Sequence, residues 1–94
     1  MGYWVLSKIY IDFKKRITKK TIDRIREIIK EIECSNLYFE SQSIFFETGG
    51  NKGVEYDFLD KIKKEFKDKI QTINANEYIE SDGGGYYWEN ENVR

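Results

Sequence analysis

The chain has 94 residues, with 16 basic and 17 acidic side chains, no histidine and one cysteine. A chain of this length has room for one hydrophobic core, so residues 1–94 are expected to form a single domain. The near-zero net charge argues against general nucleic-acid binding, and a lone cysteine excludes an internal disulfide. No apolar run approaches the roughly 20 residues of a membrane span, which favours a cytoplasmic protein.

The first predicted elements are a strand and a helix. The segment YWVLSKIYIDF at 3–13 is rich in β-branched and aromatic residues, and its odd positions form an apolar face interrupted only by Ser7. Five isoleucines then recur at helical spacing between residues 22 and 32. We expect a helix over 18–34, capped by Thr18 or Thr21 and stopped by Ser35 and Asn36.

Two short apolar runs follow, at 37–40 and 43–48, with a spacing typical of a β-hairpin. Apolar residues at intervals of four predict a second amphipathic helix over 54–68. Residues 70–81 are expected to form a strand that Asn74 and Asn76 weaken, which indicates a bulge or an exposed edge. SDGGG at 81–85 then predicts a tight turn leading into a fifth strand over 86–94.

This order of elements predicts the fold class. Strand, helix, strand, strand, helix, strand is the split βαβ arrangement of a ferredoxin-like α+β sandwich, with an antiparallel sheet and both helices on one face. The C-terminal strand is an addition to that arrangement.

The surplus of aromatic residues is the strongest functional signal. The chain has 15 aromatic residues, and strand alternation directs one set of side chains toward the helices: Val5, Ile9, Ile11, Leu37, Phe39, Ile44 and Phe46. The same alternation directs Trp4, Tyr10, Tyr38 and Phe45 to the open sheet face, where Tyr87, or Tyr86 with Trp88, joins them depending on register. An exposed aromatic patch is typical of an interaction surface. The predicted partner-binding residues are Trp4, Tyr10, Tyr38, Phe45, Tyr87 and Trp88, with Glu80, Asp82, Glu89 and Glu91 as an acidic rim.

Catalytic, metal and cofactor sites are not expected. Without histidine, the chain lacks the commonest general base and zinc ligand. Cys34 is expected to be a buried or half-buried residue at a helix end. Antiparallel pairing of the first and fourth strands would keep Asp12 away from Glu80 and Asp82, so a metal site shared within one chain is not expected.

Two further segments are candidates for other ligand classes. The loop GGNKG at 49–53 lacks the spacing of a phosphate-binding loop, but it is the candidate region if the protein sequesters a small molecule or nucleotide. Acidic residues interrupt a basic run, which favours a solvated helix face over a nucleic-acid surface. The run comprises Lys14, Lys15, Arg16, Lys19, Lys20, Arg24 and Arg26.

The layout of the chain resembles a class of known proteins. The MGYWVLSKIYID start, the two-helix plan and the closing glycine segment with Trp88 and an Asn-rich end are similar to small ferredoxin-like proteins of phages and mobile elements, some of which are anti-CRISPR inhibitors. The resemblance implies a non-enzymatic protein-binding inhibitor or accessory factor and transfers no functional residue. The acidic rim would attract a basic protein partner, for example a nucleic-acid-handling enzyme, and the aromatic patch also allows a homodimer.

A second resemblance gives the alternative function. YID at 10–12 resembles the strand-end aspartate of the Cas2-like nucleases, which share this fold. It implies a metal-dependent nuclease in which Asp12 residues from two chains of a dimer supply the carboxylates.

Overall fold

The computed structural model describes residues 5–30, 32, 34–50, 57–79 and 83–89. Its elements in chain order are β1 (Val5–Phe13), α1 (Lys19–Ile29), β2 (Cys34–Phe39), β3 (Ser43–Gly50), α2 (Asp57–Glu65), β4 (Ile70–Ile79) and β5 (Gly83–Glu89). The strands form one antiparallel sheet in the order β2-β3-β1-β4-β5. The first four strands have the ferredoxin-like order and β5 extends the sheet beyond β4, so the predicted fold is confirmed.

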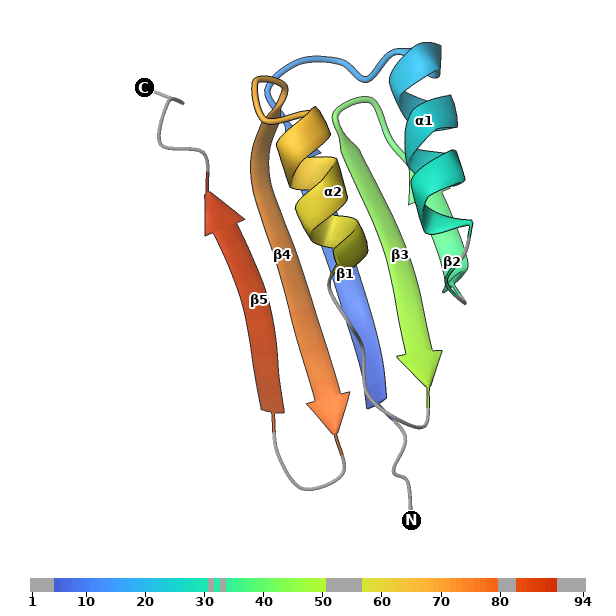
Figure 1. Ribbon diagram of the computed structural model, residues 1–94, viewed down its shortest axis with the longest axis vertical. Coiled ribbons are helices and arrows are strands. Elements are labelled where there is room, and N and C mark those ends of the chain that lie inside the picture. Colours follow the sequence, from blue (N-terminus) through green and yellow to red (C-terminus); the bar gives the residue numbers. More distant parts are fainter. Residues whose placement is uncertain (1–4, 31, 33, 51–56, 80–82, 90–94) are drawn as a thin grey trace.

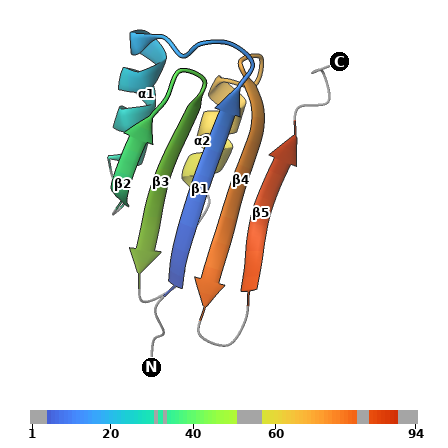
Figure 2. The same cartoon turned by 180° about the vertical axis from the view of Figure 1, so that it is seen from behind.

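Both helices cover one face of the sheet (Figure 1), and the opposite face carries no described helix (Figure 2). Strand alternation explains this division, because Ile9 and Ile11 of β1 are fully buried while Tyr10 between them is exposed. The core is Ile9, Ile11, Phe13, Ile25, Ile29, Ile44, Phe46, Phe58, Leu59, Ile62, Phe66, Ile70, Ile73 and Ala75. In the part of the chain that is described, neither helix is long and apolar enough to span a membrane.

The predicted start of α1 is confirmed and its predicted end is wrong. Thr18 is the N-cap, since its hydroxyl accepts a hydrogen bond from the backbone N–H of Thr21 at 3.3 Å. The helix ends at Ile29, and Cys34 begins β2 instead of ending the helix. The helical spacing of isoleucines misled the prediction because Ile32, beyond the helix, still packs against the core. Pairing of Cys34 with Thr48 draws this segment into the sheet.

The boundaries around α2 and β5 also differ from the predictions. The described part of α2 is Asp57–Glu65, and residues 67–69 form a turn instead of continuing the helix. Gly83, Gly84 and Gly85 belong to β5, opposite Tyr78, Glu77 and Asn76, so the prediction that these glycines form the turn is wrong. Residues 80–82 and 90–94 lie outside the described residues.

The predicted weakness of β4 at its asparagines is not observed. The strand is continuous and pairs with β1 on one side and β5 on the other, so it is not an edge. Its irregularity lies nearer its start: Asp12 pairs with Thr72 but Phe13 pairs with Ile70, which leaves Gln71 as an extra residue. Hydrogen bonding to strands on both sides compensates for the low β-propensity of asparagine.

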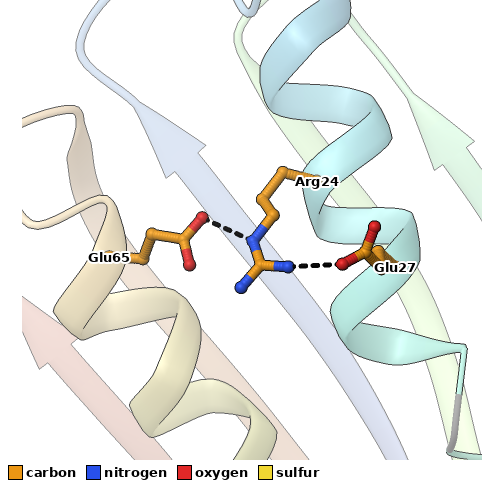
Figure 3. Close-up of polar contacts among 3 residues, drawn as sticks. All are labelled: Arg24, Glu27 and Glu65. Carbon is orange, nitrogen blue, oxygen red and sulfur yellow. Dashed lines mark hydrogen bonds and ion pairs between the residues drawn. The ribbon is translucent and has the colours of Figure 1, made fainter.

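An arginine links the two helices (Figure 3). Arg24 Nε of α1 donates to Glu65 Oε2 of α2 at 2.7 Å, and Arg24 Nη1 donates to Glu27 Oε1 at 2.6 Å. The hydrogen bond from Arg24 is the main cause of a lowered pKa of the Glu65 carboxyl. The pair is solvent-exposed, so its contribution to stability is modest and sensitive to salt.

Replacing Glu65 by glutamine is therefore expected to lower the urea midpoint slightly at pH 7. Because the folded-state pKa of Glu65 is lowered, its stabilisation is present above the ordinary glutamate pKa of about 4.3 and is lost as the pH falls through the folded-state value. The difference in midpoint between wild type and Glu65→Gln should thus shrink from pH 7 to pH 3. Asp68→Asn, an exposed residue with no described ion pair, is the control. An equal difference at both pH values would contradict the assignment.

A buried hydroxyl lies beneath the helices without a partner. Thr48 is 5% exposed, its neighbours across the sheet are Ser7 and Cys34, and its Oγ1 has no hydrogen-bond partner among the described residues. An unpaired buried hydroxyl costs about 1–3 kcal/mol. Thr48→Val keeps the shape of the side chain, so it is expected to raise the free energy of unfolding by about 1 kcal/mol, measured by urea denaturation. Thr48→Ser retains the hydroxyl and should be destabilising; lower stability of the valine variant would contradict the prediction.

Candidate protein-interaction face

The open sheet face carries a row of side chains that crosses all five strands, here called the aromatic row. Strand register places Tyr38, Phe45, Tyr10, Asn74 and Tyr87 side by side, one from each strand. The ring centroids of Tyr10 and Phe45 are 4.7 Å apart, with an angle of 41° between the ring planes. The ring centroids of Tyr38 and Phe45 are 6.1 Å apart, with an angle of 20° between the ring planes. Three rings thus form a continuous platform, and Tyr87 continues the row beyond Asn74.

The aromatic row is accessible to a partner. Tyr38 and Tyr87 are 59% and 61% exposed, and Tyr10 is 43% exposed. Asn74 Oδ1, in the middle of the row, is buried and has no hydrogen-bond partner among the described residues. Exposed aromatic side chains gathered on one face are typical of an interaction surface.

A shallow groove of about 420 Å³ opens along part of this row and is here called the aromatic groove. Tyr10, Tyr38 and Phe45 line it together with two carboxylates, Asp12 and Glu40. Phe39, Ser43 and Ile44 complete the lining. The groove therefore combines an aromatic surface with two negative charges.

A hydroxyl group lies beside each carboxylate of the groove. Thr72 Oγ1 donates to Asp12 Oδ2 at 3.0 Å, and Ser43 Oγ approaches Glu40 Oε1 at 3.5 Å. Each contact engages one oxygen, so the second oxygen of each carboxylate can accept a further hydrogen bond. Sequence reasoning missed these two acids as binding residues. Their signal was position: Asp12 is two residues from Tyr10 on one strand, and Glu40 directly follows the strand of Tyr38.

The structure places most of the predicted surface aromatics on this face. Tyr10, Tyr38, Phe45 and Tyr87 all belong to the aromatic row. Trp88 does not, because it pairs with Ile73 and packs against the core under the helices, with Lys63 Nζ 5.9 Å from its ring centroid. The alternative register, with Tyr86 and Trp88 on the open face, is therefore wrong. Trp4 lies outside the described residues.

Part of the predicted acidic rim can be located. Glu89 lies opposite Thr72, which in turn lies opposite Asp12, so Asp12 and Glu89 share the row next to the aromatic row. On the other side of the aromatic row, Lys8 of β1 lies opposite Glu47 of β3. The Glu47 carboxylate accepts a hydrogen bond from the side-chain amide of Asn36. Glu80, Asp82 and Glu91 lie outside the described residues. The described part of the acidic rim therefore includes Glu89, which was predicted, and Asp12, which was not.

The predicted basic run is divided among different environments. Arg24 is engaged by two glutamates, and the Arg26 guanidinium lies 4.9 Å from the ring centroid of Phe39. Other members line a cavity of about 370 Å³ beside the start of α1. Its basic lining residues are Lys14, Lys15, Arg16 and Lys69. The run is thus not one continuous surface along a helix.

The other site candidates remain dispersed. Cys34 is half-buried at the start of β2, and burial raises the pKa of its thiol, which lowers its reactivity. Asp12 lies opposite Thr72 near the start of β4, far along the strand from its last residue, Ile79. Among the described residues, no three His, Cys, Asp or Glu side chains are grouped to hold a metal ion. Gly49 and Gly50 end β3, and residues 51–53 of the predicted loop lie outside the described residues.

The described fold is a ferredoxin-like core with an added C-terminal strand. Comparison of the chain with models of protein families, with curated proteins and with solved structures finds no match in any of the three.

Proposed function

We propose that this protein is a non-enzymatic binding protein that occupies a protein partner through its open sheet face and β5, as an inhibitor or accessory factor of a phage or mobile element. The observation that carries the proposal is the aromatic row, since three exposed tyrosines and Phe45 lie on the face that the helices leave uncovered. Tyrosine is among the residue types that most often dominate interface energy. The phage or mobile-element origin rests only on the layout-level resemblance.

The charge of the face supports a protein partner over a nucleic acid. Bases also stack on aromatic sheet surfaces, but the carboxylates of Asp12, Glu40 and Glu89 accompany the aromatic row. Phosphate groups would be repelled by these charges, whereas a basic protein surface would be attracted.

Capture of the partner from the native host, followed by affinity measurement with purified components, tests this proposal. Tyr38→Ala is expected to weaken binding by about 2 kcal/mol or more, roughly 30-fold in Kd, because it truncates one of the most exposed side chains of the aromatic row. Lys61→Ala on the exposed surface of α2 is the control and should bind normally. Circular dichroism checks that both variants are folded. Normal binding by both Tyr38→Ala and Tyr10→Ala would exclude this face as the interface.

A further inference from the structure

We propose that the aromatic groove receives an arginine side chain of the partner. This inference rests on the proposed function and specifies which chemical group the open face recognises. Its starting point is the composition of the groove: Tyr10, Tyr38 and Phe45 supply ring surface, and Asp12 and Glu40 supply negative charge. The described residues that line the groove include no lysine or arginine, so the two carboxylates have no cation within the lining.

The geometry suits a planar cation with an apolar stem. Tyr38 and Phe45 are stacked with an interplanar angle of 20°, and Phe45 adjoins Tyr10 at 4.7 Å between centroids. A guanidinium group stacks on such rings with its N–H groups pointing outward in its own plane, parallel to the ring, where they can reach carboxylates at the edge. A lysine ammonium is a compact, strongly hydrated charge that gains less from stacking.

The carboxylates are positioned for this contact. Thr72 donates a hydrogen bond to one oxygen of Asp12, and Ser43 lies beside one oxygen of Glu40. The remaining oxygens can accept charge-assisted hydrogen bonds from a guanidinium. With a volume of about 420 Å³, the groove has room for one long side chain and its neighbouring backbone.

Titration with blocked arginine peptides, followed by NMR chemical shifts, tests the inference without knowledge of the partner. The probe is a nonapeptide with three arginines separated by glycine and serine, compared with the same peptide carrying lysine or citrulline. We expect shifts at Tyr10, Asp12 and Tyr38, and binding at least about tenfold weaker for citrulline, which lacks the charge. Equal binding of the arginine and citrulline peptides would overturn the proposal.

Two double variants that have the same net charge distinguish recognition by the groove from a general effect of net charge. The double variant Asp12→Asn, Glu40→Gln should lose about tenfold in arginine-peptide affinity, because it neutralises both carboxylates of the groove. The control Asp57→Asn, Asp60→Asn removes two charges from α2, on the helix-covered side, and should bind as wild type. Equal weakening by both double variants would show a non-specific charge effect and overturn the proposal. So would a single-stranded oligonucleotide that shifts the same signals more strongly than the arginine peptide.

The captured partner distinguishes this inference from the proposed function. If Tyr38→Ala abolishes partner binding while Asp12→Asn, Glu40→Gln leaves it unchanged, the open face is the interface and the arginine assignment is wrong. If both variants bind the partner normally, the proposed function itself fails.

Discussion

Replacing Phe46 by alanine is expected to lower the free energy of unfolding by about 3–5 kcal/mol, because a fully buried phenylalanine leaves a cavity when it is truncated. Phe46 of β3 has no exposed surface and contacts Phe58 of α2, with ring centroids 6.0 Å apart. The change thus removes packing between the sheet and a helix. Since small domains are stable by about 5–15 kcal/mol, the loss is a large fraction of the total. Urea denaturation followed by circular dichroism measures it.

The neighbouring residue provides the control. Phe45 lies on the opposite face of the same strand, where its ring contacts Tyr10 and Tyr38. Phe45→Ala should therefore cost only about 1 kcal/mol, the value of surface aromatic pairs on a sheet, while it weakens partner binding. Because a one-residue slip exchanges the two faces of a strand, equal destabilisation by the two variants would contradict the register of β3.

The sheet could be predicted because its two faces have different chemistry. In β1, Ile9, Ile11 and Phe13 alternate with polar or aromatic residues, which directs one set of side chains into the core. The same alternation in β3 separates Ile44 and Phe46 from Phe45. These patterns determined both the fold class and the placement of the aromatic row on the open face.

The predicted element boundaries are wrong where pairing between distant strands, and not the local sequence pattern, determines the structure. Helical spacing continues to Ile32, but backbone pairing of Cys34 with Thr48 determines where the chain becomes a strand. The three glycines of β5 have high turn propensity, yet hydrogen bonding to β4 holds them in the sheet. Tertiary contacts thus override local propensity at the end of α1 and at the start of β5.

The groove acids were missed for a related reason. Glu40 lies beside the β2–β3 turn, and its N–H donates to the Ser43 carbonyl at 2.8 Å. The sequence indicates Asp12 only as a metal ligand, because the residues beside it on neighbouring strands are far away along the chain. Cross-strand register brings both carboxylates to the edge of the aromatic row. A binding groove on a sheet face is therefore harder to predict than the face itself.

The last two aromatics of β5 give the second large expected effect, which tests whether the C-terminal strand belongs to the core. Trp88 is half-buried against the core and lies beneath Lys63, whereas Tyr87 is exposed on the aromatic row. Trp88→Ala is expected to cost about 2 kcal/mol of stability, less than the roughly 3–5 kcal/mol of a fully buried aromatic, and to leave partner affinity unchanged in the folded protein.

Tyr87→Ala should give the reverse result, because its side chain contributes to the open face and little to the core. We expect a change of stability within about 0.5 kcal/mol and a loss of partner affinity, with urea denaturation and titration of the captured partner as the two measurements. Trp88→Phe, which retains an aromatic ring on the helix side, should recover most of the stability lost in the alanine variant. If Tyr87→Ala is the more destabilising change, β5 pairs with β4 one residue out of the described register, and Trp88 returns to the open face.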